Sequence, residues 1–268
     1  MADTAALLAT YDARMRMPPS IVPTGVTYEH DGPIVRIVGS HVGRIRAPRD
    51  VGVTGAELDR LIARQRDYFQ ARGQGVEWKV RAHDLPADLP ERLIAAGFAP
   101  EEQAAVLLGV SEEVAAEPVL PDGAVLRRVS EDEDLRRIAD QQSEVFGIDL
   151  SWIAADLIAR VSAGPDQITI LVVEADGRFV SSAWSMYEPG SDYVALLGGS
   201  TLPGWRGRGL YRALIAARAQ EAAARGFRLL HVDASPASAP ILRRCGFHQI
   251  TTSMHYQVEA PRVTTHAE

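Results

Sequence analysis

The segment GGSTLPGWRGRGLYRALIAARAQEAAARGF, residues 198–227, decides the fold of the region around it. The apolar run at 192–202 is typical of a buried strand, Pro203 interrupts it, and a helical repeat of apolar residues follows. Between strand and helix, RGRG at 206–209 places two glycines and two guanidinium groups at a helix N-terminus. The first N–H groups of a helix lack intrahelical partners and carry positive partial charge, so the turn is predicted to bind an anion. The alternative is a simple glycine turn with solvated arginines.

The elements after this segment have a recognisable order. Gly226 ends the helix, a strand is predicted at 228–235 and a short helix at 236–244, Gly246-Phe247 follows, and a final strand is predicted at 248–259. This series resembles the acyl-CoA-binding core of the GNAT acetyltransferases, in which a strand leads into Arg/Gln-x-x-Gly-x-Gly/Ala and a long helix. Arg206 and Gly209 match the first and fourth positions of that motif, whereas Tyr211 stands where the family usually has a small residue. The resemblance covers roughly residues 122 to 260.

The resemblance implies a mixed α/β fold and acetyl-CoA, or another acyl-CoA, as co-substrate. It implies that strand backbone at Gly199, Ser200 and Thr201 pairs with the pantetheine arm, and that the turn wraps the pyrophosphate. Polar termination of a strand is the alternative role for Ser200 and Thr201. The residues implied to bind the cofactor are Gly199, Ser200, Thr201, Arg206, Gly207, Arg208, Gly209, Leu210, Tyr211, Arg212 and Ser235.

The catalytic residues are not assigned by the sequence. Where many family members carry an acidic tyrosine and a basic glutamate, this chain has Leu242 and Ala195. His231 and Asp233 alternate along a predicted strand and share a face, where an acid–base pair or a core histidine would both fit. Cys245 is interpreted as a core residue. The remaining polar candidates near predicted strand ends or on a helix are Glu144, Tyr187, Asp192 and Tyr193. No histidine or cysteine spacing indicates a metal site, and GGSTL is not a hydrolase elbow.

Composition is that of a soluble enzyme. The chain has 268 residues, of which 46% are hydrophobic, enough for one or two cores. Its net charge of −7 argues against nucleic acid as the main partner. One cysteine excludes an internal disulfide and fits a reducing cytoplasm. No signal peptide or membrane span is expected, so we predict a cytoplasmic protein without a membrane partner.

The preceding residues predict a similar series of elements. We expect a helix up to Met17, two strands joined at Asp31 and Gly32, an edge strand or loop at 43–51, and a helix at 55–73. A strand at 76–80, a helix at 85–98 and a strand at 101–110 follow. Beyond a linker at 117–123, the predicted elements are a strand at 124–130, helices at 131–147 and 149–164, and a hairpin turning at Asp176 and Gly177.

The two halves share their landmarks. Gly32 and Gly177 lie 145 residues apart, Gly73 and Gly226 lie 153 apart, and the Gly-Phe pairs at 97 and 246 lie 149 apart. This near-constant offset indicates an internal duplication. We therefore predict two GNAT-like lobes, each a mixed, mainly antiparallel sheet flanked by helices. The predicted parts are a degenerate domain at 1–116, a linker at 117–123, an acyl-CoA-binding domain at 124–260 and a tail at 261–268.

The halves differ at the expected phosphate site. In place of RGRG the first half has DVGVTGAELD at 50–59, which lacks arginine and carries Asp50, Glu57 and Asp59. Acidic groups at a helix start repel phosphate, so we expect the first half to be structural and the chain to be a monomer with an internal pseudo-dimer. The leading hypothesis is acyl transfer from acetyl-CoA to an amine of an unidentified small molecule or peptide. A non-catalytic acyl-CoA sensor or scaffold is the alternative.

Overall fold

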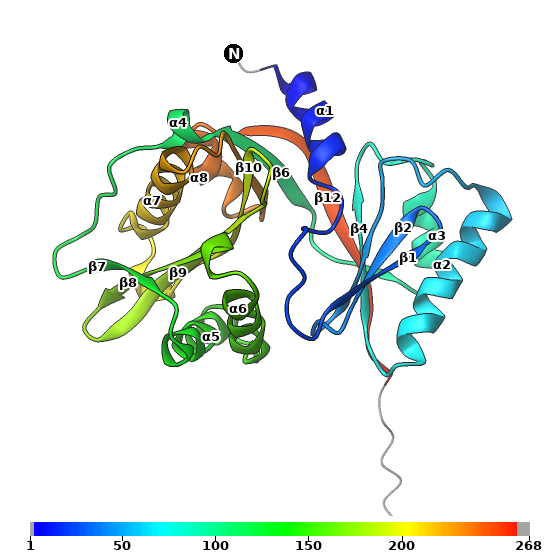
Figure 1. Cartoon of the computed structure of the whole chain (residues 1–268), viewed down its shortest axis with the longest axis horizontal. Helices are drawn as coiled ribbons and strands as arrows, with labels where there is room; N and C mark the ends of the chain where they lie inside the picture. Colours follow the sequence, from blue (N-terminus) through cyan, green and yellow to red (C-terminus); the bar gives the residue numbers. More distant parts are fainter. Residues whose placement is uncertain (1–2, 262–268) are drawn as a thin grey trace, which may run out of the picture. The chain divides into compact units, whose positions relative to one another are not determined.

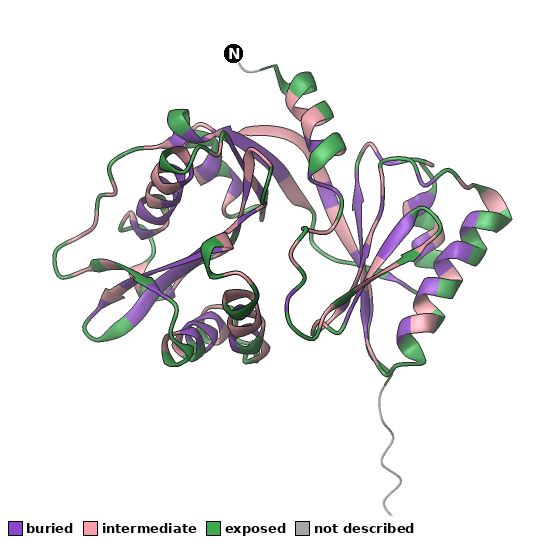
Figure 2. Cartoon of the chain, in the orientation of Figure 1, coloured by how far each residue is buried: buried purple, intermediate pink, exposed green. Residues whose placement is uncertain are grey.

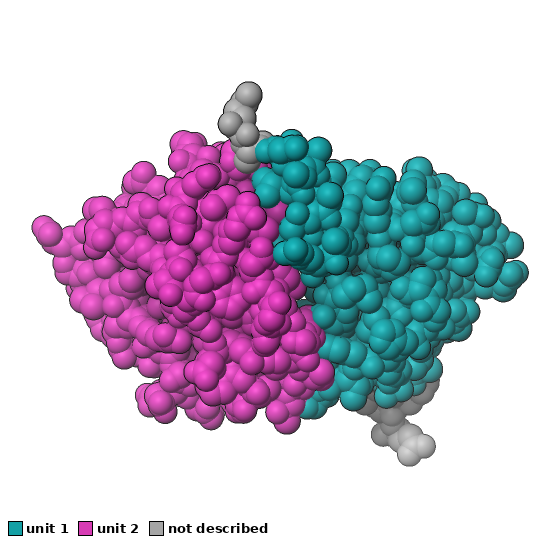
Figure 3. Space-filling view, turned by 45° about the horizontal axis from the view of Figure 1, so that its top comes forward, with its two compact units in different colours: residues 1–18, 25–105, 250–268 teal, residues 19–24, 106–249 magenta. Residues whose placement is uncertain are grey.

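The computed structural model describes residues 3–261, and these residues form two compact units (Figure 3). Within the described range, the first unit comprises residues 3–18, 25–105 and 250–261, and the second comprises 19–24 and 106–249. The predicted tail lies outside the described residues except for Pro261. Both units combine a sheet with flanking helices (Figure 1), which confirms the predicted fold class.

The sheet of the first unit has the strand order β1-β2-β3-β4-β12. Neighbouring strands are antiparallel except for β3 and β4, which are parallel. β5 pairs with the other side of β12. The strands are β1 (Thr27–Asp31), β2 (Ile34–Val38), β3 (Gly43–Arg46), β4 (Val76–Arg81), β5 (Ala99–Pro100) and β12 (His248–Val258). The prediction of an edge strand or loop at 43–51 is wrong for β3, because β3 lies between β2 and β4.

Helices α2 (Gly55–Gln70) and α3 (Leu89–Ala95) pack on this sheet. Leu58, Leu61, Ile62 and Phe69 recur at helical spacing along α2, and all four are buried. Figure 2 shows the result as a buried stripe along one side of α2 and an exposed stripe along the other. Trp78 of β4 contributes the largest buried side chain of this core. The periodic apolar pattern therefore predicts the position of α2 correctly.

The sheet of the second unit has the order β6-β11-β10-β9-β8-β7. β7 to β10 form an antiparallel series, and β10 is parallel to β11. The strands are β6 (Ala104–Val110), β7 (Val125–Val129), β8 (Ile168–Ala175), β9 (Arg178–Tyr187), β10 (Tyr193–Thr201) and β11 (Leu229–Ala234). The helices of the chain outside α2 and α3 are α1 (Thr4–Arg14), α4 (Ser111–Val114), α5 (Asp132–Phe146), α6 (Trp152–Ala163), α7 (Leu210–Ala224) and α8 (Ala239–Arg244).

Two cores lie on opposite faces of the second sheet. Even-numbered residues of β8, such as Ile170, pack with α5 and α6, whereas odd-numbered residues, such as Leu171, pack with α7. Successive side chains of a strand point to opposite faces, so α5 and α6 cover one face and α7 covers the other (Figure 1). Residues within the predicted linker belong to this unit, and Leu120 packs against the α7 core.

The last strand of each half of the sequence lies in the other unit. β6 follows α3 in sequence but neighbours β11, whereas β12 follows α8 but pairs with β4. The predicted domains at 1–116 and 124–260 are continuous in sequence, whereas each compact unit contains the final strand of the other half.

Two local expectations need correction. Asp31 pairs with Ile34, so the first hairpin turns at Gly32 and Pro33, one residue later than predicted. A glycine is required there because Gly32 has φ +61°. The predicted helix at 85–98 is shorter, because α3 begins only at Leu89. Among residues 3–261, no helix is both long enough and apolar enough to cross a membrane.

Candidate functional site

The parallel strands β10 and β11 diverge part of the way along their length. Their register contains three pairs, which end at Ala195 and His231. β10 then continues to Thr201 and β11 to Ala234 without further pairing between them. The predicted strand residues Gly199, Ser200 and Thr201 all lie on the diverging part of β10. We call this opening the β10–β11 fork. It leaves backbone groups along one side of β10 for an extended ligand.

A β-bulge interrupts β10 beside the fork. Leu197 is in register with Trp184 and Ser200 with Ser182, so Gly198 and Gly199 together oppose one residue of β9. A bulge of this kind redirects backbone groups and frequently lies beside an active site. Gly198 has φ +62°, and a Cβ there would lie 1.9 Å from the Trp184 ring. Only glycine therefore fits at this position.

The turn before α7 has the form that the sequence predicted. Gly207 and Gly209 have φ values of +77° and +86°, and α7 begins at Leu210. Gly209 is the N-cap residue, so no side chain caps the helix. A Cβ on Gly207 would have no neighbour within 4 Å. The turn therefore offers open backbone and uncapped N–H groups, which are the features of an anion site.

The three predicted arginines lie around this turn. Arg206 donates from Nε to the carbonyl oxygen of Thr201 at 3.2 Å, which links the turn to the end of β10. The Arg208 guanidinium lies 4.6 Å from the centroid of the Trp205 ring. Arg212 is exposed in the first turn of α7. All three guanidinium groups remain on the exposed side of the unit and could pair with phosphate oxygens.

Tyr211, which departs from the family motif, packs toward β10. A Cβ on Gly199 would lie 2.6 Å from its ring, so the missing side chain of Gly199 makes room for the tyrosine. Burial raises the pKa of the Tyr211 phenol. The ring therefore lies against the strand at the fork, while Leu210 is buried in the α7 core.

A buried polar network that the sequence analysis missed supports β10. Ser200 is buried, and its hydroxyl contacts Gln141 and Gln142 of α5. Gln142 also donates to the Ser182 hydroxyl at 2.9 Å and to the carbonyl oxygen of Gly198 at 2.7 Å. The sequence contained one signal of this network. Leu135, Ile138, Ala139 and Gln142 have the i, i+3, i+4, i+7 spacing of a buried helix face, on which an apolar residue is expected in place of the glutamine.

Arg218 is a second buried polar residue at the bulge that the sequence did not single out. It is 2% exposed and donates from Nε to the Leu214 carbonyl oxygen at 3.0 Å. Its Nη1 lies 3.3 Å from the Trp184 carbonyl oxygen and 3.4 Å from that of Leu197. Burial lowers the pKa of Arg218 to about 10, which leaves the side chain charged at pH 7.

The structure brings His231 and Asp233 together as predicted from their alternation. His231 Nε2 lies 3.8 Å from a carboxylate oxygen of Asp233, and His231 is the last residue of β11 in register with β10. Ser235 is exposed, and its hydroxyl accepts from the backbone N–H of Ser238 at the start of α8. Leu242 is buried in an apolar position.

The other polar residues that the sequence offered as candidates make structural contacts. Tyr187 is buried and makes an edge contact with Phe227, and burial raises its pKa. Burial also raises the pKa of Tyr193 to about 12 and that of the Cys245 thiol above its usual range. Glu144 forms an exposed ion pair with Arg178. The backbone carbonyl of Asp192 accepts from the N–H groups of Arg228 and Leu229. A neutral, partly buried thiol such as Cys245 is a poor nucleophile.

The corresponding fork of the first unit is partly closed. β3 and β4 also pair in parallel over three positions, up to Ile45 and Trp78. Beyond them, Leu85 donates to the carbonyl oxygen of Arg49 at 2.8 Å and accepts from the N–H of Val51 at 3.2 Å. Asp50 accepts from the N–H of Gly52 and so stabilises the turn. The backbone groups that are open in the second unit are therefore partly satisfied by the chain itself in the first.

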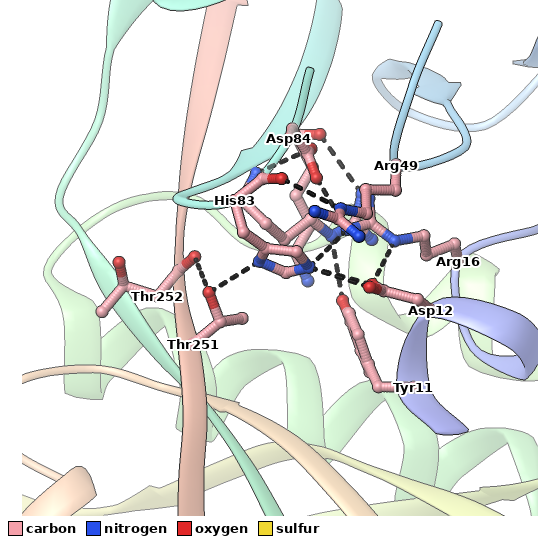
Figure 4. Close-up of polar contacts among 10 residues, drawn as sticks. Tyr11, Asp12, Arg16, Arg49, His83, Asp84, Thr251 and Thr252 are labelled. Atoms are coloured by element: carbon pink, nitrogen blue, oxygen red, sulfur yellow. Dashed lines mark hydrogen bonds and ion pairs between the residues drawn. The ribbon is translucent and has the colours of Figure 1, made fainter. Parts of the chain in front are cut away.

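Charged side chains of the first unit form a network between α1 and the loop after β4 (Figure 4). Arg16 contacts Asp12 and Asp84, each at 2.6 Å. His83 lies 3.0 Å from Asp12 and 2.9 Å from the Thr251 hydroxyl. Burial alone would raise the pKa of Asp12, but the hydrogen bonds from His83 and Arg16 outweigh it and lower the pKa. This network ties α1 to the loop after β4.

A second charged cluster in the first unit has the residue types of a metal site. Glu77, Glu101 and His255 place their ligand atoms within 4.8 Å of one another, although the sequence spacing indicated no such group. Within the cluster, His255 Nδ1 lies 3.0 Å and the Arg44 Nε 3.9 Å from the Glu77 carboxylate. Burial alone would raise the pKa of Glu77, but His255, Arg44 and Arg46 lower it to about 2. This geometry is that of an ion-pair cluster.

Part of the second unit matches a known protein family. Residues 133–247 match the model of the acetyltransferase (GNAT) family. None of the curated proteins compared with this chain matches it. A GCN5-related N-acetyltransferase from Kribbella flavida is 18% identical, with a TM-score of 0.66 over 98% of each chain. A tandem GNAT protein from the clavulanic acid biosynthesis pathway is 14% identical, with a TM-score of 0.62 over 97% of this chain and 95% of that one.

These structural likenesses show a shared fold over nearly the whole chain. The family match covers α5 to Phe247 and therefore includes the bulge, the β10–β11 fork and the glycine turn. The chain thus contains a domain of the GNAT acetyltransferase family, which spans residues 133–247.

Proposed function

We propose that the second unit transfers an acetyl group from acetyl-CoA to the amine of a small molecule or peptide. The observation that carries this proposal is the β10–β11 fork beside the glycine turn, which together give one unit an open strand edge and an anion site. Acetyl-CoA supplies an activated thioester. Backbone groups of Gly199 to Thr201 would hold the pantetheine arm, and residues 206–212 would hold the pyrophosphate.

The chain's own groups would contribute orientation and charge stabilisation. Strand N–H groups near Thr201 would donate to the oxygen on which negative charge develops during acyl transfer. Removing a proton from an amine of pKa about 10.4 at pH 7 costs about 4 to 5 kcal/mol. A substrate of lower pKa, a water relay or a side chain such as His231 would lower this cost. A CoA thiol ionises near a pKa of about 8.5 and leaves with little help from an acid.

We propose that the first unit is degenerate with respect to acyl-CoA. Its fork is partly closed by Leu85, and residues 50–59 offer carboxylates and no arginine. One acyl-CoA should therefore bind per chain. Isothermal titration calorimetry measures this number directly, and two equivalent sites per chain would contradict the assignment.

A non-catalytic acyl-CoA sensor or scaffold is the second candidate. The observation in its favour is that Ala195 and Leu242 stand where many relatives have a base and an acid. The test is a thiol-release assay with acetyl-CoA across a panel of amines, run beside calorimetric binding of acetyl-CoA. Binding with amine-dependent thiol release supports the enzyme, binding without release supports the sensor, and no binding contradicts both. We further propose that the protein acts as a cytoplasmic monomer without a nucleic-acid or membrane partner.

A further inference from the structure

The bulge in β10 is held by side chains from both faces of the sheet. Gln142 of α5 donates to the Gly198 carbonyl oxygen at 2.7 Å. Arg218 of α7 reaches the Leu197 and Trp184 carbonyl oxygens. Since α5 and α7 cover opposite faces of this sheet, two consecutive carbonyl groups of β10 are contacted from opposite sides.

These contacts replace strand pairing that the bulge removes. Neither Gly198 nor Gly199 is in register with a residue of β9 or β11. Two consecutive glycines have more backbone freedom than any other pair and would lose the most entropy when fixed. The Trp184 and Tyr211 rings fill the space where their side chains would be, and the two polar contacts determine how the carbonyls point. The redirected backbone is thus fixed before any ligand binds.

The buried charge of Arg218 indicates that this side chain has an electrostatic role in addition to its packing role. Among residues 3–261, no carboxylate pairs with this guanidinium, and its contacts are carbonyl oxygens. A buried cation without an acidic partner is costly, and an apolar side chain of similar length would avoid that cost. Its positive charge lies at the strand where a thioester oxygen would become negative, and it is screened little by solvent.

We propose that Gln142 and Arg218 are positioning residues, which fix the bulge so that its backbone N–H groups point into the β10–β11 fork and polarise the acyl carbonyl. This inference rests on the proposed function. It does not require either side chain to touch the substrate, because both act through the backbone of Leu197 and Gly198. We call the two residues the bulge clamp.

The test compares Gln142→Leu and Arg218→Met with matched controls. Gln220→Leu on α7 and Arg225→Met at the C-cap of α7 make the same changes away from the bulge. Each variant is checked for folding by circular dichroism. Affinities for CoA and for acetyl-CoA are measured by calorimetry. The carbonyl stretch of bound ¹³C-labelled acetyl-CoA is measured by isotope-edited infrared spectroscopy, and kcat by thiol release.

We expect both clamp variants to bind CoA within about threefold of wild type, because the glycine turn is intact. The carbonyl band should shift toward its position in free acetyl-CoA, and kcat should fall at least about tenfold, since displaced catalytic groups cost this much or more. The controls should keep the wild-type band and kcat. Arg218→Lys, which keeps the charge, should recover part of both.

A wild-type band and kcat in folded Gln142→Leu and Arg218→Met would overturn the bulge clamp. If Arg218→Met does not fold, the carbonyl band and kcat of Gln142→Leu and Arg218→Lys test the bulge clamp instead. Failure of the wild-type protein to bind acetyl-CoA would overturn the proposed function and the clamp together. Wild-type binding and turnover with unchanged clamp variants would overturn the clamp alone.

Discussion

The two parallel forks of this molecule begin alike and end differently. β3 and β4 in the first unit and β10 and β11 in the second each pair over three positions. In each pair, the first strand is followed by a glycine-containing segment that leads into a helix, α2 after β3 and α7 after β10. In the second unit, β10 and β11 then continue without further pairing between them, and β10 leads into α7. In the first, Leu85 pairs with the backbone around Asp50. The same order of elements therefore leaves an open strand edge in one unit and a partly closed one in the other.

The two units satisfy their backbone and polar groups in different ways. An open strand edge costs stability unless a ligand or another strand covers it, and the first unit satisfies part of its edge internally. Its polar residues pair with one another in the Arg16 and Glu77 clusters. In the second unit, Gln142 and Arg218 instead support a bulge in the strand that lines the fork. The predictions below test this difference.

The largest effect should follow removal of residues 1–115. This deletion removes β6 from the second sheet and removes β4, the partner of β12. The remaining chain would expose a sheet edge and apolar surface, so we expect aggregation or dimerisation. Size-exclusion chromatography with light scattering measures this. A stable, fully active monomer of residues 116–268 would show that the first unit is dispensable.

The next largest effect should come from Gly209→Val. A valine at φ +86° is strained, and its bulk would stand where a phosphate approaches the backbone. We expect acetyl-CoA affinity measured by calorimetry to fall at least about 100-fold. The matched control is Gly52→Val in the first unit, where φ is +70° and a Cβ would meet no atom within 4 Å; at Gly209 the nearest atoms lie at 3.7 and 3.8 Å, which are ordinary van der Waals contacts. Unchanged affinity in a folded Gly209→Val protein would contradict the assigned phosphate site. Weakened affinity in Gly52→Val would contradict the assignment of acyl-CoA binding to the second unit alone.

Glu77→Gln should change stability and leave acetyl-CoA affinity unchanged. The pKa of Glu77 is lowered to about 2 in the folded protein, so its stabilisation is present above the ordinary value of 4.5 and is lost as pH falls toward 2. We expect a loss of about 1 to 3 kcal/mol in the free energy of unfolding at pH 7, which shrinks below pH 4.5. Urea unfolding at pH 7, 5 and 3.5 measures it. A pH-independent difference would remove the electrostatic explanation.

Arg206→Ala should have the smallest effect. The side chain is exposed, so solvent partly replaces its charge, and we expect a loss of about threefold to tenfold in acetyl-CoA affinity. Calorimetry at low salt and at 0.5 M salt tests this, because the difference from wild type should shrink as salt screens the charge. Arg178→Ala, at an exposed ion pair away from the turn, is the control. A loss as large as that of Gly209→Val would assign Arg206 a more direct role.

Local features of this protein could be predicted from the sequence because neighbouring residues determine them. The spacing of Leu58, Leu61 and Ile62 placed α2, and Asp176-Gly177 placed the β8–β9 turn, where both residues have positive φ. The glycine turn before α7 followed from RGRG and the apolar repeat after it. Each depends on backbone freedom and hydrophobic periodicity over a few residues. The duplication was predicted for the same reason, since its landmarks are glycines that end local elements.

Only the tertiary structure decided which backbone groups remain open. The bonds between Leu85 and the backbone around Asp50 join residues some 35 positions apart in the sequence. Gln142 and Gly198 are 56 positions apart, and Arg218 and Leu197 are 21 positions apart. β6 and β12 exchange sheets across still greater separations. Such pairings depend on how strands and helices pack, and no local pattern encodes them. A glutamine within an apolar helix face signals that a buried partner exists, but the partner is selected only when the fold brings its carbonyl within hydrogen-bonding distance.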